Sequence, residues 1–193
     1  MAYIIGLTGG IGSGKTTLVN YMESLGIPVF IADEEAKKAM QSPHVLEEVK
    51  TSFGNSIFEN GQLNRQQLAS IVFSNPDKLK ELNSIIHPEV KRLFVIWLEQ
   101  HKPVPFVVYE AAILFESGSY QNCDYIITVT APLEDRITRV MQRDNCSREQ
   151  VLQRINVQWT DEERAAKSNF VIDNTTAQSA KNEIDKILKI LKN

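Results

Sequence analysis

One glycine-rich stretch near the start of the chain constrains its fold more than any other feature. Residues 9–17 read GGIGSGKTT, which fits the pattern G-x-x-x-x-G-K-[ST]. An apolar run from Tyr3 to Thr8 precedes this stretch, and the helix-like residues 18–22 follow it. A strand, a glycine-rich loop and a helix in this order predict a loop that wraps phosphate groups. The alternative is a glycine-rich turn that matches by chance, which does not account for the flanking strand and helix.

The chemistry of phosphate binding explains these residue types. Glycines let backbone N–H groups approach a phosphate without obstruction by side chains, and the start of a helix adds its positive dipole end. We expect Lys15 to reach the outer phosphates of a nucleotide and the Thr16 hydroxyl to complete the shell of a Mg²⁺ ion. The remaining residues expected to line the phosphates are Gly10, Ile11, Gly12, Ser13, Gly14 and Thr17.

Composition predicts an ordinary globular domain. The chain has 193 residues, of which 42% are hydrophobic and 23% charged, and its formal net charge is -3. This charge gives no general attraction to nucleic acid or to an anionic membrane, so neither is expected as a partner, and no obligate protein partner is evident. Cys123 and Cys146 have no metal-ligand spacing and imply no disulfide framework. Because no leader precedes the first strand and no apolar run approaches about 18 residues, we expect a cytoplasmic enzyme.

Strand-like and helix-like segments alternate along the chain, as is typical of an α/β protein. Strands are predicted at residues 3–8, 28–31, 106–109, 125–129 and 170–172. Helices are predicted at 15–25, 34–40, 65–73, 90–98, 132–144 and 177–191, and capping boxes at 147–150 and 160–163 begin two more. Val45, Val49 and Phe53 recur at helical spacing, and Pro76 is expected at a helix start. The continuous apolar strands indicate a parallel sheet of about five strands with helices on both faces. Between residues 34 and 101 we expect only helices and turns, with one turn at residues 58–61.

Arginines gather in one region of the sequence. Six of the eight arginines fall between residues 136 and 164, and Arg136, Arg139 and Arg143 share one helical face at i, i+3 and i+7. One interpretation is a solvated face with ion pairs to neighbouring acidic residues, namely Glu134, Asp135 and Asp144. The other is a lid over residues 136–165, because phosphoryl transfer needs cations over the transferred group and exclusion of water.

Two acidic residues follow predicted strands of the sheet. Asp33 comes after strand 28–31 and Glu110 after strand 106–109, so both are expected at the carboxyl edge where parallel sheets bind ligands. A carboxylate there can accept a hydroxyl proton and orient the oxygen for in-line attack, which suits Asp33. Glu110 could position a substrate or hold Mg²⁺ through water. Both alternatives remain open: Asp33 as the cap of a helix starting at Glu34, and Glu110 as an ordinary loop acid.

An ordered set of motifs resembles the dephospho-coenzyme A kinase family through nearly the whole chain. A phosphate-binding loop alone is shared by very many NTPases, whereas this ordered set is far more specific. The stretches that carry the resemblance are residues 7–15, Ala32-Asp33, Gly61-x-Leu63-x-Arg65-x-x-Leu68 with Val72-Phe73, Ile86-His87-Pro88, Ile113-Leu114-Phe115-Glu116, Arg139-x-x-x-Arg143-Asp144, Arg154-x-x-x-Gln158 and Phe170-Val171-Ile172-Asp173-Asn174.

The resemblance implies a three-layer P-loop NTPase fold with sheet order 2-3-1-4-5, counting the strands along the chain. It implies one kinase domain with a core at about 1–33, 102–135 and 166–193. A coenzyme-A-binding helical insertion would occupy about 34–101, and a small helical lid about 136–165.

The implied activity is ATP-dependent phosphorylation of the ribose 3′-hydroxyl of dephospho-CoA, the last step of coenzyme A synthesis, with ATP and Mg²⁺ as cofactors. Asp33 falls on the family's catalytic carboxylate, and Arg65 and His87 match contacts to the substrate. His87 also fits a structural turn residue before Pro88. Residues matching the lid and the adenine end of ATP are Arg139, Arg143 and Asn174.

The sequence departs from the family's pattern in three places. Many members carry an aspartate two residues before the catalytic one, where this chain has Ile31, so Asp33 must act without that neighbour. In the motif around residue 113, Ala112 replaces a frequent proline and Glu110 replaces the usual aspartate. The last two changes roughly preserve shape or charge.

Two other classes of protein share parts of the pattern. A nucleoside or nucleoside-monophosphate kinase would have the same loop and a similar lid, and only its substrate would separate it from the first hypothesis. A GTPase-like switch would need an Asn-Lys-x-Asp segment to read guanine, which this sequence lacks. It would also have no use for a lid rich in arginine.

Overall fold

The computed structural model describes residues 2–59, 61–101 and 103–192, and for Phe73 it describes the backbone alone. The chain divides into two compact units. The larger unit comprises Met1–Ile31 and His101–Asn193, and the smaller unit comprises Ala32–Gln100. None of the helices among the described residues is both long and apolar enough to cross a membrane.

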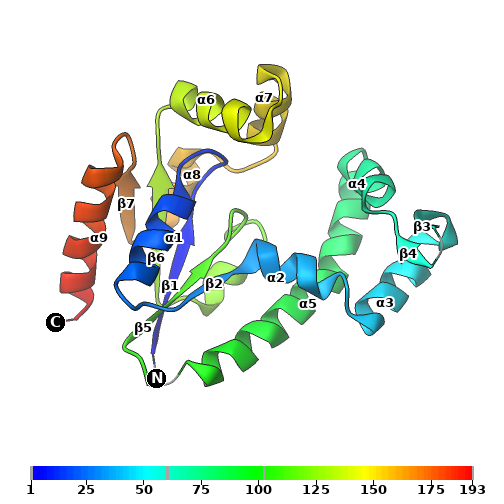
Figure 1. Cartoon of the computed structure of the whole chain (residues 1–193), viewed down its shortest axis with the longest axis horizontal. Helices are drawn as coiled ribbons and strands as arrows, with labels where there is room; N and C mark the ends of the chain where they lie inside the picture. The colour runs from blue at the N-terminus through cyan, green and yellow to red at the C-terminus, as the bar shows by residue number, and fades with distance from the viewer. Residues whose placement is uncertain (1, 60, 102, 193) are drawn as a thin grey trace. The chain divides into compact units, whose positions relative to one another are not determined.

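The larger unit is built on a five-stranded parallel sheet (Figure 1). Its strands are β1 (Tyr3–Thr8), β2 (Val29–Ile31), β5 (Phe106–Glu110), β6 (Tyr125–Thr130) and β7 (Phe170–Asp173). They lie in the order β2-β5-β1-β6-β7, which confirms the order that the family resemblance implied. Because the strands are parallel, the loops after β1, β2, β5, β6 and β7 all emerge at one edge of the sheet.

Alternation along β1 explains how helices cover the two faces of this sheet. Ile5 and Leu7 are fully buried in a core with residues of α1 (Lys15–Ser24) and α9 (Ala177–Leu191). Gly6 points to the other face, where a Cβ would lie 2.9 Å from both the Leu114 and the Cys123 side chains. Both faces of β1 are therefore buried from Ile5 to Thr8, which accounts for its continuous apolar sequence.

Three shorter helices complete the larger unit between β6 and β7. They are α6 (Leu133–Asp144), α7 (Arg148–Asn156) and α8 (Asp161–Lys167). The predicted capping boxes are confirmed: Ser147 and Thr160 each accept a hydrogen bond from the backbone N–H three residues later, and the third residue's side chain accepts from the cap in return. Ile137 and Val140 of α6 and Val151 of α7 form a separate small core.

The smaller unit is mainly helical. It comprises α2 (Ala32–Ala39), α3 (Pro43–Phe53), α4 (Arg65–Phe73) and α5 (Pro76–Gln100), with one turn of 3₁₀-helix at Asn55–Ile57. The expectation of helices and turns alone is wrong, because β3 (Phe58–Glu59) pairs with β4 (Gln62–Leu63) in an antiparallel hairpin. Asn60, which the prediction placed in the turn, lies outside the described residues.

The helix α5 is longer than the predicted segment because it continues through a proline. The predicted helix start at Pro76 is confirmed. The sequence analysis placed an amphipathic helix at 90–98 and left His87 open as a turn residue, but one helix runs through Pro88 without a break. Proline removes one backbone hydrogen bond at this point. Buried residues on both sides of Pro88 hold the helix together across it, namely Leu82, Ile86, Val90 and Phe94.

A buried carboxylate links two helices of the smaller unit and gives a prediction for its stability. Glu89 of α5 accepts hydrogen bonds of 2.7 and 2.8 Å from Arg92, and His44 Nε2 of α3 lies 3.2 Å from it. Arg92 holds the pKa of Glu89 below its ordinary value of about 4.5. A lowered carboxyl pKa stabilises the native state above the ordinary pKa, and this contribution is lost as the pH falls through the native pKa.

We therefore expect Glu89→Gln to lower the melting temperature by roughly 3 °C near neutral pH. The difference from wild type should shrink below about pH 4.5, because wild-type Glu89 then takes up a proton. Thermal melts at several pH values measure this difference in melting temperature. Glu81→Gln on the same helix is the control, because Glu81 forms a more exposed ion pair with Lys78. A difference that stays constant down to pH 3 would contradict the assignment to Glu89.

Candidate active site

The loop at residues 9–17, here called the phosphate loop, joins β1 to α1 and has the backbone conformation that the sequence predicts. Gly12 and Gly14 have φ angles of 78° and 90°, which side chains rarely adopt. Close packing also favours glycine at both positions, since a Cβ on Gly14 would collide with Asn174 and one on Gly12 would lie 2.5 Å from the backbone O of Arg136. Gly12 and Gly14 are therefore glycine for both conformation and space.

Three successive carbonyl groups of the phosphate loop are held by side chains from outside it. Ile11 O accepts from Arg136 Nε at 3.0 Å, and Gly12 O from Arg139 Nη1 at 3.4 Å. Ser13 O accepts from Asn174 Nδ2 at 2.8 Å. The C=O and the N–H of one peptide point in opposite directions, so the N–H groups of Gly12 and Gly14 point away from these donors. Such a concave set of N–H groups is an anion-binding arrangement.

Lys15 adds a positive charge beside this arrangement. It is the first residue of α1, and its Nζ donates to Gly9 O at 2.8 Å and lies 3.8 Å from Glu110 Oε1. The side chains of Lys15 and Glu110 are 12% and 10% exposed, so both charges are largely shielded from water. Glu110 is the last residue of β5, not the first of a loop as predicted, and it aligns with Leu7 and Ile31 across the sheet.

The residues of this site fit a nucleoside triphosphate with its metal ion. Thr16 and Thr17 are exposed in the first turn of α1, where a hydroxyl can reach a ligand at the helix start. The Ser13 hydroxyl is buried and has no hydrogen-bond partner among the described residues. Within the same residues, no cluster of three or more His, Cys, Asp or Glu could hold a metal ion. The Thr16 hydroxyl is the group predicted to hold a Mg²⁺ ion together with the phosphates.

The three arginines on α6 have different surroundings, although their spacing puts them on one face. Arg136 is buried and Arg139 half-buried, and both donate to the phosphate loop. Arg139 also donates to Asn174 O at 3.1 Å, which brings two predicted ATP-binding residues together. Arg143 is 58% exposed and pairs with Asp144, as the ion-pair interpretation expected.

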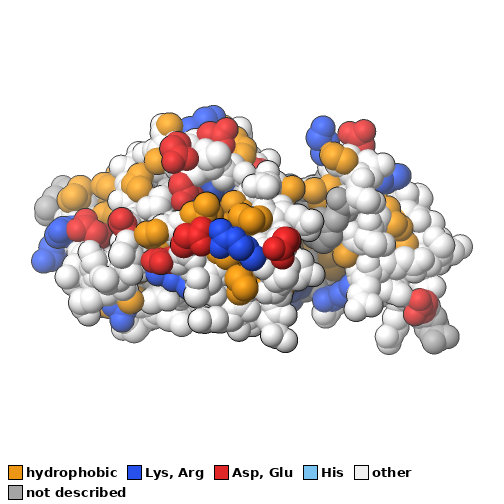
Figure 2. Space-filling view, turned by 90° about the horizontal axis from the view of Figure 1, so that it is seen from above, with side chains coloured by type: hydrophobic (Ala, Val, Ile, Leu, Met, Phe, Trp, Pro, Cys, Tyr) orange, Lys and Arg blue, Asp and Glu red, His pale blue; other side chains and the backbone are white. Residues whose placement is uncertain are grey.

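The two arginines of α7 also pair with acidic residues. Arg154 shares Asp144 with Arg143 at 2.6 Å, and Arg148 binds Glu134 with two bonds of 2.7 Å. Figure 2 shows acidic and basic side chains intermixed on the face that it draws. These exposed pairs contribute little to stability, because water and salt screen them.

Arg143 gives a test of the lid hypothesis. If its guanidinium moves over the transferred phosphoryl group, Arg143→Ala should lower kcat at least tenfold. Arg154→Ala is a matched control, because Arg154 binds the same carboxylate and is 49% exposed. Steady-state kinetics and thermal melts of both variants measure the effect. If both variants lose the same small amount of stability and keep their kcat, the ion-pair interpretation is correct for Arg143.

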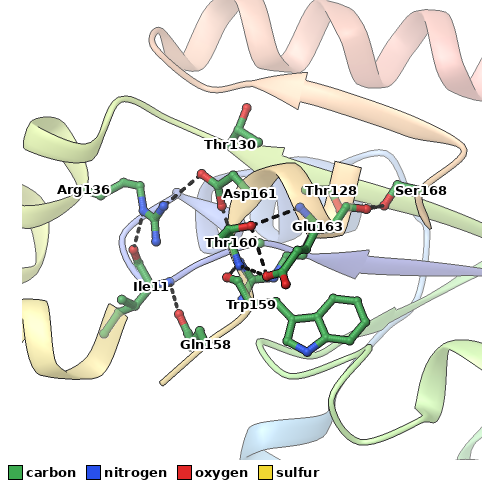
Figure 3. Close-up of polar contacts among 12 residues, drawn as sticks. Ile11, Thr128, Thr130, Arg136, Gln158, Trp159, Thr160, Asp161, Glu163 and Ser168 are labelled. Atoms are coloured by element: carbon green, nitrogen blue, oxygen red, sulfur yellow. Dashed lines mark hydrogen bonds and ion pairs between the residues drawn. The ribbon is translucent and has the colours of Figure 1, made fainter. Parts of the chain in front are cut away.

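The sequence analysis missed two residues that hold the phosphate loop, one directly and one through Arg136. Gln158 Oε1 accepts from Ile11 N at 2.9 Å, and Asp161 Oδ2 binds Arg136 Nη1 at 2.9 Å (Figure 3). Gln158 belongs to a motif that the resemblance quoted, so a signal was present without a role attached to it. Nothing in the residue pattern distinguished Arg136 from the other two arginines of the same helix.

Three predicted site residues lie in the smaller unit. Asp33 is the second residue of α2 and is exposed, so it is not the cap of a helix starting at Glu34. Arg65 begins α4 and donates to Lys37 O at 3.4 Å. His87 is half-buried in α5, and burial lowers its pKa, so it is neutral at pH 7. Their roles toward a substrate remain predictions.

Solved structures resemble this fold over nearly its whole length. A protein titled TT1252 from Thermus thermophilus superposes with a TM-score of 0.90 at 38% identity, covering 98% of this chain and 97% of that one. Dephospho-CoA kinase from Campylobacter jejuni gives a TM-score of 0.70 at 29% identity, with coverage of 100% and 98%. Shikimate kinase from Acinetobacter baumannii, at 14% identity and a TM-score of 0.55, shares the fold alone.

Comparisons of the amino-acid sequence also match dephospho-CoA kinases. Residues 3–179 match the family model for dephospho-CoA kinase (CoaE). The dephospho-CoA kinase of Bacteroides fragilis is 42% identical over 175 residues, covering 90% of this chain and 85% of that protein. That of Fusobacterium nucleatum is 40% identical over 174 residues, covering 90% of each. Together with a phosphate loop built from glycines, Lys15 and bound carbonyls, these matches show that the chain belongs to the dephospho-CoA kinase family.

Proposed function

We propose that this protein transfers the γ-phosphoryl group of ATP to the ribose 3′-hydroxyl of dephospho-CoA, giving coenzyme A and ADP. The match of residues 3–179 to the family is the observation that carries this proposal. The phosphate loop supplies a site for the triphosphate in the same chain. No other substrate class is favoured by a specific feature of the described residues.

The larger unit is proposed to bind ATP. The N–H groups of the phosphate loop would surround the phosphates, and Lys15 would neutralise charge on the outer two. Arg139 and Asn174, which contact each other and the loop, are proposed to line the nucleotide beside it. Mg²⁺, held by Thr16 and the phosphates, would supply charge neutralisation at the transferred group.

The smaller unit is proposed to bind dephospho-CoA. It carries Asp33, Arg65 and His87, which match the family's motifs. Asp33 would accept the hydroxyl proton and orient the attacking oxygen, while Arg65 would pair with a phosphate of the substrate. Neutral His87 would contribute a hydrogen bond rather than a charge. Glu110 is proposed to help position the acceptor through its place beside Lys15.

Residues 136–165 are proposed to act as a lid, in which Arg143 would cover the transferred group and exclude water. A cytoplasmic location is proposed on the basis of the metabolic family. The partners proposed are small molecules, with no nucleic acid and no membrane among them.

The proposal is tested by an ADP-release assay across two sets of acceptors. We expect turnover with dephospho-CoA and little or none with adenosine or AMP. Calorimetric titration of the three compounds measures binding separately from chemistry. Turnover with AMP or adenosine in preference to dephospho-CoA would instead indicate a nucleoside or nucleoside-monophosphate kinase.

A further inference from the structure

Residues of the proposed lid, 136–165, hold the backbone of Ile11 in the phosphate loop from both sides. Ile11 N–H donates to Gln158 Oε1 at 2.9 Å, and Ile11 O accepts from Arg136 Nε at 3.0 Å (Figure 3). The Ile11 side chain packs on the small core of α6 and α7. Ile11 is thus fixed by two hydrogen bonds and one apolar contact, all to residues between 136 and 158.

Asp161 determines where the Arg136 guanidinium points. The two side chains form an ion pair of 2.9 Å, and they are only 7% and 20% exposed. A buried guanidinium must keep its partner, because an uncompensated charge in this environment is costly. Arg136 donates Nη1 to Asp161 and Nε to Ile11 O, so one rigid planar group joins the carboxylate to the loop.

Asp161 is in turn fixed by the sheet through α8. Its other oxygen lies 3.4 Å from Arg164 Nη1, and the Arg164 side chain is fully buried. Arg164 also binds Glu116 at 3.3 Å, in the segment that follows β5. At the end of α8, Ser168 shares a 2.7 Å hydrogen bond with Thr128 of β6. The anchor of this network is therefore the central sheet rather than a flexible surface.

Contacts of Trp159 also fix the connection between α7 and α8, residues 157–160. Both polar groups of the Trp159 peptide are bound: its N–H donates to Glu116 at 3.0 Å, and its C=O accepts from Arg164 at 2.5 Å. The Trp159 ring stacks on Phe115 with centroids 5.3 Å apart and an angle of 4° between the planes. Gln158 directly precedes this fixed residue, so its side chain reaches the loop from a defined position.

We propose that Gln158 and Asp161 are positioning residues for ATP. They hold the backbone of Ile11, so that the N–H groups of the phosphate loop already have the orientation that the phosphates need before ATP binds. Gln158 acts on Ile11 directly, and Asp161 acts through Arg136. Without these contacts, the phosphate loop would become ordered only when ATP binds. The free-energy cost of this ordering would lower the affinity for ATP. The inference rests on the proposed function only to the extent that the loop binds a triphosphate.

The test uses two variants with matched controls. Gln158→Met keeps the side-chain length and removes the acceptor, and Gln153→Met makes the same change at an exposed position of α7. Asp161→Asn removes the charge that holds Arg136, and Glu162→Gln removes a charge from the exposed next residue. Calorimetric titrations with Mg·ATP and with inorganic tripolyphosphate, without dephospho-CoA, report on the phosphate site alone.

We expect both test variants to bind tripolyphosphate and ATP about tenfold more weakly, while both controls remain within twofold of wild type. The KM for ATP should rise by a similar factor, and kcat at saturating ATP and the KM for dephospho-CoA should change little. A purely structural role would lower thermal stability without this split between ATP affinity and kcat.

Unchanged tripolyphosphate affinity in a folded Gln158→Met protein would overturn the proposal. If Asp161→Asn does not fold, the comparison of Gln158→Met with Gln153→Met still decides it. A wild-type protein that binds both phosphate probes but does not phosphorylate dephospho-CoA would refute the proposed function. In that case the affinities of the variants would still test the role of Gln158 and Asp161.

Discussion

Lys15→Met is expected to lower kcat about a thousandfold, because it removes the cation closest to the phosphate loop. Lys15 Nζ lies 2.8 Å from Gly9 O and is largely shielded from water, so its charge acts in a medium that screens it weakly. The charge that develops on the transferred group must then be neutralised without Lys15, by backbone dipoles, the metal ion and the proposed lid arginine Arg143. Steady-state kinetics with ATP and dephospho-CoA measure the loss.

The control for Lys15 must separate lost catalysis from lost folding. Glu110 lies 3.8 Å from Lys15, so removing the ammonium takes a cation away from a buried carboxylate and lowers stability. The double variant Lys15→Met/Glu110→Gln removes that carboxylate charge too. We expect the double variant to regain melting temperature and to remain inactive. A single variant within tenfold of the wild-type kcat would contradict the role given to Lys15.

The phosphate loop and its flanking elements could be predicted because local sequence determines them. β1 begins and ends at the predicted residues, and so do α4 and α9. In the loop, positions 12 and 14 require glycine because their φ angles are positive, a conformation that glycine adopts without strain. The order of the five strands needed the family resemblance, because composition says nothing about which parallel strands are neighbours.

Two elements of the smaller unit were missed wholly or in part, for opposite reasons. The hairpin of β3 and β4 has two residues in each strand, too few to show alternation of apolar and polar side chains. The helix α5 shows the pattern well, but Pro88 is a strong signal for a helix end. In the structure, buried residues on both sides of the proline outweigh the lost hydrogen bond.

The sequence predicted the glycine-rich motif of the site, but it did not show which other residues hold the phosphate loop. Arg136, Arg139 and Arg143 are equivalent by spacing, yet Arg136 is buried against the loop and Arg143 is exposed beside Asp144. The difference arises from Asp161, which is 25 residues from Arg136 in sequence and reaches it only in the folded chain. Side-chain hydrogen bonds of this kind have no periodicity that a sequence pattern could reveal.

Asp33→Asn is expected to lower kcat about a hundredfold and to leave the affinity for ATP within twofold of wild type. The proposed role is to accept the proton of the attacking hydroxyl and to orient its oxygen, and an amide can do neither as well. Among the described residues, the Asp33 carboxylate makes no hydrogen bond or ion pair, and it is exposed. The substitution therefore disturbs few contacts of the fold.

The competing role for Asp33 is a purely local one at the start of α2. Asp33, Glu34 and Glu35 all lie in the first turn, where a negative charge stabilises a helix by about 0.3–1 kcal/mol. Glu34→Gln removes a charge from the same turn and is the matched control. If the charge matters only to the helix, both variants lose the same small stability and keep their kcat. If Asp33 handles the proton, only Asp33→Asn loses turnover, and it does so with ATP still bound at wild-type affinity.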